Sequence, residues 1–414
     1  MTTREENDLL TQVGPGTPGG DWFRRYWNPA ALSEEVPAGG APRPIRLLGE
    51  DLVLYRDEDG QVGCLGIHCS HRGADLSYGR LEDGGLRCIY HGWLYDRTGR
   101  CLEQPGEPTG STFHEKIRHT AYPCEERGGM IFAYMGPGAP PLFPNYEFLM
   151  GPAENHLCSK YFQDDNYLQG NEGNVDPAHL GFLHRFFRPD QGDVRQEYHA
   201  GDLSPTIDPV ETDWGLHAYA VRKVGDNHFI KVRSLVLPAL TTVGSRGADY
   251  YLVNWHVPID NEHHWRYGVS YSRKEPIEAT ERRLAHEGID ENFHLMRNRA
   301  NRYLQDREEM KTQTYIGLGK DFVLHDTMVT ESEGQIWDRT LEHLGYTDRA
   351  IVAMRKMILR AIQDVQEGKD PPGVVRDETQ NDFADVIARD DMLPQEIDWR
   401  WHWKANKALA GVAR

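Results

Sequence analysis

The sequence predicts an α+β protein, with a small all-β domain near the N-terminus and a larger domain in which helices and strands mix. Residues 44–136 consist of short apolar runs separated by turn signals, such as DEDG at 57–60. Strand-like runs follow at 228–240 and 248–259. A helical pattern at 347–368 completes the mixed part, and 414 residues are enough for both domains.

The pattern at 347–368 is the clearest helix signal in the chain. Thr347 or Asp348 can cap its start, and Gly368 with Pro371 ends it. Its apolar residues recur at helical spacing and form one stripe, made of Ile351, Met354, Ile358, Ala361, Ile362 and Val365. A helix with one buried face is therefore expected here.

The composition along the chain predicts three segments. Residues 1–43 form an N-terminal helical segment that packs on the larger domain and ends in the Pro/Gly-rich stretch PAGGAPRP. Residues 44–136 form the all-β domain, and residues 137–414 form the larger domain. Near the C-terminus, the acidic stretch 370–391 predicts a loosely packed tail.

The charge balance excludes several classes of function. The formal net charge is −18 and the pI is near 5.5, whereas phosphate binding relies on Lys and Arg, so no nucleic-acid role is expected. No apolar run approaches the roughly 18 residues of a membrane helix, and the start of the chain lacks the apolar segment of a signal peptide. We expect a cytoplasmic protein without membrane contact, whose acidic surface suits a basic patch on a protein partner.

Two Cys–His pairs lie close together in the all-β segment. Cys69 and His71 form a C-x-H pair, and Cys88 and His91 form a C-x-x-H pair. Two Cys and two His can hold zinc, but zinc fingers usually group Cys with Cys and His with His. One Cys and one His on each of two loops favour two bridged irons, as in a Rieske [2Fe–2S] centre. A zinc-stabilised binding protein without redox chemistry is the alternative.

All six cysteines lie in the first 160 residues. In a chain from a reducing compartment, such clustering favours metal ligation over disulfides. The cysteines outside the two pairs are expected to be ordinary half-buried thiols, namely Cys64, Cys101, Cys124 and Cys158.

The segment 69–101, CSHRGADLSYGRLEDGGLRCIYHGWLYDRTGRC, resembles the Rieske domain of aromatic-ring-hydroxylating oxygenases. It contains their C-x-H-R-G-A and C-x-Y-H-G-W-x-Y elements. The segment 331–350 is further similar to the phthalate and phenoxybenzoate dioxygenase type. A Rieske domain uses only part of this chain, so the rest should hold a site that receives its electrons.

The best candidate for that site is NEGNVDPAHLGFLH at 171–184. Asp176 followed by proline is typical of a helix N-terminus and places His179 and His184 on the helix. Five residues turn an ideal helix about 140° past one circuit, so both rings reach one ion only if the helix is distorted, and we expect a π-type turn near Gly181. Spacing alone explains the two histidines equally well as incidental polar residues.

Two histidines and one carboxylate form the non-haem Fe(II) site of oxygen-activating enzymes, and the carboxylate must come from elsewhere. Asp326, followed at i+5 by Glu331, lies at the predicted start of another helix. Asp321 and Asp338 lie nearby and are the alternatives.

The resemblance favours one set of ligands. The catalytic domain of the family has a D-x2-H-x4-H run, which Asp176, His179 and His184 match. In many members the third ligand is an Asp that leads a D-x4-E segment, which Asp326 and Glu331 match. The resemblance therefore implies a mononuclear Fe(II) held by the two histidines and Asp326.

The resemblance also implies a fold and an activity. The larger, catalytic domain would be a curved antiparallel sheet around a long helix, with the iron pocket between them. O₂ would be activated there with electrons from an NAD(P)H-dependent reductase or ferredoxin, passed through the Rieske cluster. The aromatic substrate, an aryl carboxylate or aryl ether, would be hydroxylated or O-demethylated. An electron-transfer protein without oxygenase activity is the remaining alternative.

Asp176 is expected to connect the two iron sites. It precedes His179 by three residues, so its carboxylate can accept the free ring N–H, and it can also accept from His91. Nothing in the sequence makes the two motifs touch within one chain. The resemblance implies a homotrimer or higher ring, in which each Rieske centre serves the iron of the next subunit. A helix cap is the alternative role of Asp176.

Aryl carboxylates require a cation in an otherwise apolar pocket. Arg222 and Arg233 lie in or near predicted strands and could serve, although such arginines are more often paired on a solvent face. Many relatives have an Asn shortly before the bridging Asp, but Asn171 and Asn174 both qualify here, so that role is not assigned. The remaining histidines of interest are expected to be structural or surface residues, namely His217, His256, His263, His264 and His325.

Overall fold

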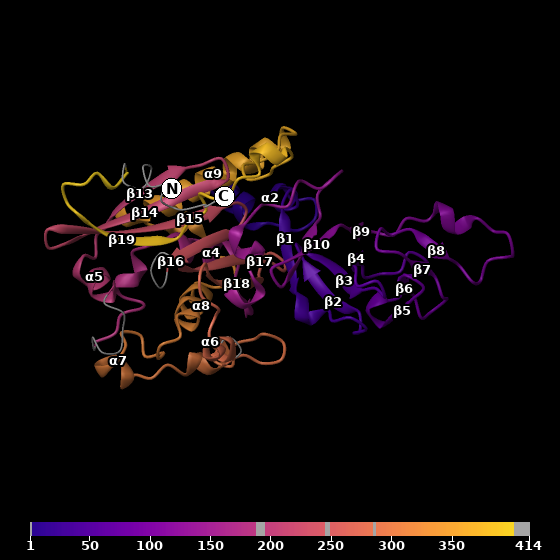
Figure 1. The fold of residues 1–414 in the computed structure, drawn as a ribbon, viewed down its shortest axis with the longest axis horizontal. Helices are drawn as coiled ribbons and strands as arrows, with labels where there is room; N and C mark the ends of the chain where they lie inside the picture. Colours follow the sequence, from indigo (N-terminus) through magenta and orange to yellow (C-terminus); the bar gives the residue numbers. More distant parts are fainter. Residues whose placement is uncertain (1, 188–194, 245–248, 285–286, 401–414) are drawn as a thin grey trace.

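The computed structural model describes residues 2–187, 195–244, 249–284 and 287–400. The molecule is elongated, with the all-β part at one end and the large sheet with its helices at the other (Figure 1). The predicted α+β fold class is confirmed.

Short strands joined by tight turns make the all-β part, as the sequence predicts. Its described residues form two four-stranded antiparallel sheets, in the orders β2-β3-β4-β9 and β5-β6-β7-β8. DEDG joins β3 to β4, with Gly60 at φ +80° in the turn. The strands are β2 (Arg43–Leu47), β3 (Glu50–Arg56), β4 (Val62–Gly66), β5 (Arg80–Glu82), β6 (Gly85–Arg87), β7 (Leu94–Tyr95), β8 (Cys101–Glu103) and β9 (Ala121–Tyr122).

A three-stranded sheet adjoins the all-β part and contains a strand that the sequence did not predict. It pairs β1 (Trp27–Leu32), β11 (Met130–Tyr134) and β10 (Cys124–Arg127) in that order. β1 lies in the segment for which helices and a linker were predicted. The predicted helices precede it as α1 (Arg4–Thr11) and α2 (Pro18–Phe23), and both contact the long helix α9 (Arg349–Gln366).

The larger part is built on an antiparallel sheet of eight strands among the described residues. Their order is β12-β18-β17-β16-β15-β14-β13, with β19 paired to β15. The runs expected at 228–240 and 248–259 correspond to β15 and β17. The strands are β12 (His156–Gln163), β13 (Thr206–Glu211), β14 (Gly215–Val224), β15 (Asn227–Val236), β16 (Leu240–Gly244), β17 (Tyr250–Pro258), β18 (His264–Ser272) and β19 (Arg389–Pro394).

Helices pack on this sheet, and two of them, α4 and α8, flank the candidate site. α9 contacts β13 and β14, and α4 contacts β16, β17 and α8 (Figure 1). The predicted stripe of α9 is buried except for Ile351, which is partly exposed. The other helices are α3 (Glu147–Met150), α4 (Tyr167–Val175), α5 (Arg195–Gly201), α6 (Ala279–Leu284), α7 (Glu309–Thr312) and α8 (Phe322–Ser332).

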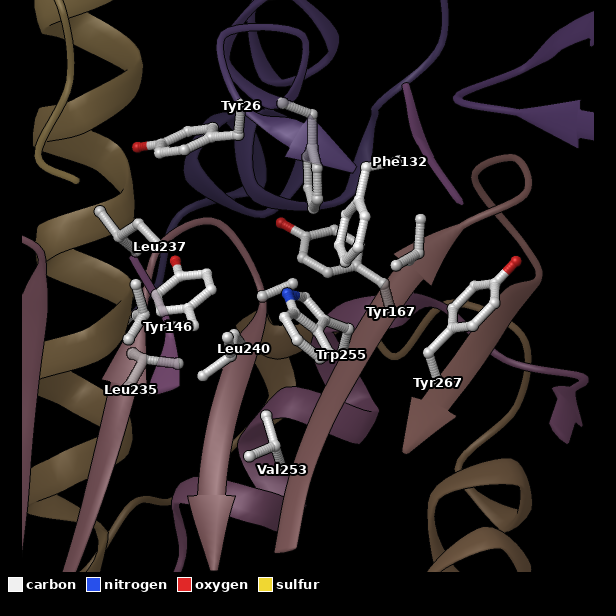
Figure 2. Packing of buried hydrophobic residues seen from close by; sticks show 14 of the residues in the cluster. Tyr26, Phe132, Tyr146, Tyr167, Leu235, Leu237, Leu240, Val253, Trp255 and Tyr267 are labelled. Atoms are coloured by element: carbon white, nitrogen blue, oxygen red, sulfur yellow. The ribbon is translucent and has the colours of Figure 1, made fainter. Parts of the chain in front are cut away.

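Aromatic side chains join the three-stranded sheet to the large sheet. Figure 2 shows Trp255 of β17 among Phe132 of β11, Tyr146 and Tyr167. The ring centroids of Phe132 and Trp255 are 6.0 Å apart, and those of Tyr146 and Trp255 are 6.3 Å apart. Such edge-to-face pairs add about 0.5–1.5 kcal/mol each beyond the area they bury. The core thus continues from one part into the other.

The acidic stretch near the C-terminus is not a loosely packed tail, so that prediction is wrong. Phe383, Val386 and Ala388 are buried in the main core, and β19 then joins the sheet. β19 carries the acidic pair Asp390 and Asp391. Composition misled here because Asp390 is neutralised by cations on other elements.

Candidate functional site

The two Cys–His loops have the same backbone. In each, the cysteine N–H donates to the carbonyl five residues later, and the glycine four residues later donates to the cysteine carbonyl, at 2.8–2.9 Å. Those glycines, Gly73 and Gly92, have φ of +75° and +76°, a conformation that favours glycine. The repeated geometry presents Cys69 and Cys88 in equivalent positions.

The four predicted ligands lie together at these loops. Cys69 and Cys88 are both 3% exposed, and the rings of His71 and His91 are 4.5 Å apart between centroids. Trp93 stacks on His71, whose Nδ1 is buried without a hydrogen-bond partner among the described residues. Two buried thiols beside two imidazoles with a free ring nitrogen fit the ligand set of a Rieske cluster.

The other cysteines form no disulfide in the described part of the chain. Cys124 and Cys158 are partly buried, as expected. Cys64 and Cys101 are fully buried, more deeply than the half-burial predicted from the sequence.

His179, His184 and Asp326 converge on one point in the larger part. Their candidate ligand atoms all lie within 4.8 Å of one another. Asp326 Oδ1 is 3.0 Å from His184 Nε2 and 3.9 Å from His179 Nε2. Two histidines and one carboxylate on one side of a prospective ion leave other positions open, which suits a non-haem Fe(II) site.

The segment that carries the two histidines is not the helix predicted from the sequence. Helix α4 ends just before Asp176, and only the 3₁₀ turn η5 (His179–Gly181) follows. The Asp176 carboxylate accepts from the N–H groups of Ala178 (2.7 Å) and His179 (3.1 Å), so it caps this turn. The backbone then leaves helical geometry at Phe182, with φ −120° and ψ −63°. This break, rather than a π-type turn, accompanies the return of His184 towards His179.

The second nitrogen of each ring has an orienting partner. His179 Nδ1 lies 3.4 Å from the Asp176 carboxylate. His184 Nδ1 lies 3.1 Å from Nδ1 of His325, whose Nε2 is 3.0 Å from the carbonyl of Gly319. Burial lowers the pKa of His325 to about 4, so this ring is neutral, donates to the carbonyl and accepts from His184. Both candidate ligands therefore direct Nε2 at the prospective ion.

Sequence reasoning missed this role of His325. Adjacent residues on a helix do not face the same way, so its position beside Asp326 gave no signal. The alternative carboxylates lie elsewhere: Asp321 caps α8 through the N–H groups of its first turn, and Asp338 pairs with Arg4. Asp326 lies in the second turn of α8, slightly later than predicted.

The electrostatic surroundings favour an ionised Asp326. Burial raises the pKa of this carboxyl, but His184, His179 and Arg266 outweigh it and hold the pKa well below its usual value. Arg266 NH1 is 3.7 Å from Asp326 Oδ2. An ionised carboxylate is the form that binds a cation.

A cavity of about 350 Å³ opens beside the candidate ligands. Its lining includes all three ligands and Asn174, which places Asn174 at the site and leaves Asn171 buried away from its wall. The apolar lining residues are Leu180, Phe186, Val243, Leu252 and Phe322. The cationic lining residues are Arg195, Lys231, Arg233, Arg266 and Lys320.

The two arginines proposed for carboxylate binding are buried, so the alternative of a solvent-face pair is wrong. Arg233 lines the cavity, and its Nη1 donates to the carbonyls of Asn174 (2.6 Å) and Asp176 (2.8 Å). Its Nε is buried without a partner among the described residues. Arg222 lies outside the lining, and its Nη2 donates to the Pro177 carbonyl (2.7 Å). Both arginines thus support the segment that carries the histidines.

A further cation of the cavity was missed from the sequence. Lys231 and Arg195 share the carboxylate of Asp390, at 3.2 Å and 2.8 Å. Burial lowers the pKa of Lys231 to about 8, although Asp390 opposes this. Lys231 and Arg195 thus place two cationic groups at the cavity wall, beside its apolar lining residues.

A second cavity, also of about 350 Å³, shares His179 and Asp326 with the first and is lined by Asp176 as well. The rest of its lining includes the acidic Glu333 and Glu342, the cationic Arg355, and apolar side chains such as Trp337 and Leu344. Asp176 is therefore accessible from a side of the iron site that is distinct from the cationic cavity.

Two Cys–His pairs brought together in an all-β part, and two histidines converging with one carboxylate in a larger part, are the arrangement of the oxygenase component of a Rieske non-haem iron oxygenase. The family models agree: residues 26–118 match the Rieske [2Fe–2S] domain, and residues 133–413 match the LigXa C-terminal domain-like family. The chain therefore belongs to the LigXa-type Rieske oxygenases.

Similar proteins cover nearly the whole chain. The phthalate 4,5-dioxygenase oxygenase subunit of Pseudomonas putida is 33% identical over 97% of this chain and 94% of its own length. The 5,5′-dehydrodivanillate O-demethylase oxygenase subunit of a Sphingobium species is 33% identical over 91% and 84%. The oxygenase in a carbazole 1,9a-dioxygenase oxygenase–ferredoxin complex has the same fold, with a TM-score of 0.58, 20% identity, and coverage of 90% and 94%.

Membership settles the enzyme class and cofactors. The chain is an oxygenase component that carries a Rieske [2Fe–2S] domain, and the family uses a mononuclear iron with NAD(P)H electrons supplied through a reductase. No helix among the described residues is long and apolar enough to cross a membrane.

Proposed function

We propose specific ligands for the two iron sites: Cys69, His71, Cys88 and His91 for the cluster, and His179, His184 and Asp326 for the Fe(II). The observation that carries the second set is its convergence within 4.8 Å at the wall of a substrate-sized cavity. The Fe(II), when bound, supplies O₂ activation beside the aromatic ring. Asp176 and His325 keep the Nδ1 protons of the two histidines in place, and the apolar cavity wall excludes water.

The cluster assignment predicts a coloured protein. Purified protein should be red-brown and contain acid-labile sulfide, and Cys88→Ser should lose both because one thiolate ligand is gone. Cys101→Ser is the matched control, because this cysteine is equally buried in the same domain but is no ligand. Visible spectra and sulfide analysis measure the result. One bound zinc, no sulfide and no colour would contradict the assignment.

We further propose an aryl carboxylate as the substrate, with hydroxylation or O-demethylation of its ring. The named phthalate relative supports the carboxylate, and the O-demethylase relative supports an aryl ether in the same class. The cationic side chains in the cavity lining, Lys231 and Arg233 among them, are suited to one carboxylate.

Lys231→Met should weaken binding of aryl carboxylates. A charge-assisted hydrogen bond contributes about 1.5–3 kcal/mol, so KM should rise roughly 10- to 100-fold. The KM for the corresponding methyl ester should stay nearly constant, because the ester carries no charge. Lys320→Met is the matched control: this lysine lines the same cavity but is exposed, so solvent screens its effect. An equal rise for acid and ester would show that cavity shape, not charge, was altered.

We also propose that the chain works as a cytoplasmic ring of at least three subunits, fed by a ferredoxin or reductase. Large apolar side chains stand exposed around the Rieske loops, namely Tyr78, Ile89, Tyr90 and Phe113. Others stand exposed beside the second cavity, namely Leu341, Leu344 and Tyr346. Exposed apolar surface of this extent is typical of an interface. Contact between these two surfaces of successive subunits would bring His91 of one subunit close to Asp176 of the next. In this arrangement, residues 44–136 form the electron-carrying domain and residues 137–414 form the catalytic domain.

A further inference from the structure

A row of buried polar side chains runs from the wall of the first cavity into the large sheet. Asn174 Nδ2 is 2.6 Å from His256 Nε2, and His256 Nδ1 is 2.8 Å from His264 Nε2. His264 Nδ1 is 2.8 Å from the main-chain carbonyl of Asp165. His256 is 2% exposed and His264 is fully buried, and neither belongs to the ligand sets proposed above.

The backbone carbonyl fixes the protons of this row. A carbonyl only accepts, so His264 carries a proton on Nδ1. Burial lowers the pKa of His264 to about 3 and that of His256 well below its usual value. It also raises the pKa of the Asp165 carboxyl, which lies 3.2 Å from His264 Nδ1, well above its usual value, so both rings and this carboxyl are neutral. Neutral His264 then accepts at Nε2 from the Nδ1–H of His256. His256 in turn has its lone pair at Nε2, to which only the NH₂ group of Asn174 can donate.

The Gln163 amide must agree with this arrangement, because it also contacts His264 Nε2, at 2.9 Å. Its other amide atom is 2.8 Å from the Thr327 hydroxyl, which can donate or accept. The structure places the Gln163 oxygen on His264 and its nitrogen on Thr327. The neutral row requires the opposite orientation, in which the NH₂ group shares the single Nε2 lone pair of His264 with His256 and the oxygen accepts from the Thr327 hydroxyl. Rotating the Gln163 amide by a half-turn about its Cγ–Cδ bond exchanges its oxygen and nitrogen. Both contacts, to His264 and to Thr327, are kept.

We infer that the His264–His256 row holds Asn174 with its amide oxygen towards the cavity, where this oxygen accepts a hydrogen bond from a donor group of the substrate. A phenolic hydroxyl on the ring is the chemical class that fits. The inference rests on the proposed aryl carboxylate function and extends it: the carboxylate contacts Lys231, and the hydroxyl contacts Asn174. Asn174 determines specificity, and the two histidines are positioning residues.

Binding of matched benzoates tests the donor preference. Dissociation constants are measured by calorimetry on the anaerobic holoenzyme for hydroxy-, methyl- and methoxybenzoates substituted at each ring position. At one position the hydroxy compound should bind at least about 10-fold tighter than both others, because only it can donate to a buried carbonyl. Asn174→Leu should remove this preference. Methoxy bound as tightly as hydroxy would overturn the inference, since it would place the NH₂ group in the cavity.

The positioning role is tested away from the cavity wall. His264→Leu should reduce the hydroxy-to-methyl preference to within about 3-fold, with cluster and iron contents unchanged, because His256 loses the partner that fixes its proton. His264→Gln can still accept at the Nε2 position and should restore part of the preference. His217→Leu is the matched control, a buried histidine on β14 outside the row and the cavity lining, and should retain the preference. An unchanged preference in folded His264→Leu would overturn the inference.

The experiment separates this inference from the proposed function. If benzoates bind with a carboxylate requirement but without any hydroxyl preference, only the role of Asn174 is refuted. If no benzoate of the panel binds, the proposed substrate class fails and the inference falls with it.

Discussion

Asp326→Ala should lose the mononuclear iron and at least about 100-fold of the oxygenase activity, while the Rieske spectrum is retained. Removing a group that only orients a metal ligand typically lowers activity about 10- to 100-fold. The loss of activity should be larger in Asp326→Ala, because Asp326 supplies the only carboxylate among the three candidate ligands. The spectrum should survive because the cluster loops belong to a separate sheet system. Iron analysis, visible spectroscopy and substrate turnover measure the three quantities.

Two aspartates provide matched controls for that variant. Asp338→Ala removes a carboxylate that pairs with Arg4, so iron should be retained in full. Asp321→Ala removes the cap of α8, which costs about 0.5–2 kcal/mol of stability but no ligand, so iron should be retained in the folded fraction. Full activity and a full iron complement in Asp326→Ala would refute its assignment as a ligand.

The Rieske ligand set could be predicted from the sequence because its chemistry is local. Each half of the set is a short loop whose geometry depends on one cysteine and a glycine four residues later, Gly73 or Gly92. Spacing within such a loop carries the geometry directly. Only the pairing of the two loops depends on the tertiary fold.

The mononuclear site was less predictable because its geometry is tertiary. The sequence proposed a helix across His179 and His184, but the Asp176 carboxylate caps a short turn instead, and the carbonyls beyond α4 are held by buried arginines. Helical propensity cannot anticipate such long-range hydrogen bonds. Asp326 lies 142 positions after His184, so only the family resemblance singled it out.

The supporting groups of the site had no sequence signal. His325 was grouped with structural histidines, yet it fixes the proton of His184. Asp390 lies in a stretch whose composition suggested a loose tail, yet it joins two cations at the cavity wall. In both cases the partner is remote in sequence, and burial gives the side chain a role that its neighbours in sequence do not reveal.

Asp176→Asn should keep both iron sites and slow electron transfer between them about 100-fold. The amide retains the size of the carboxylate and one oxygen, which can accept from the Ala178 N–H in place of Oδ1. It loses the charge and the second acceptor oxygen, which the proposed ring requires for His91 of the next subunit. Stopped-flow bleaching of the reduced cluster under O₂ with bound substrate measures the rate, and metal analysis checks both sites. Electron transfer at the wild-type rate in Asp176→Asn would show that Asp176 serves only as a cap of the turn.

Mixed oligomers test whether the electron crosses between subunits. Cys69→Ala subunits lack the cluster and His179→Ala subunits lack the iron, so each homo-oligomer should be inactive. Within one chain the Cys–His loops and the iron site lie in different parts of the elongated molecule (Figure 1). Electron tunnelling requires proximity, so an intact cluster must reach an intact iron on a neighbour. In a ring assembled from both variants, some interfaces combine the two intact sites and should recover part of the wild-type activity. Oligomers verified as mixed but fully inactive would rule out transfer between subunits, and with it the role of Asp176 at the interface.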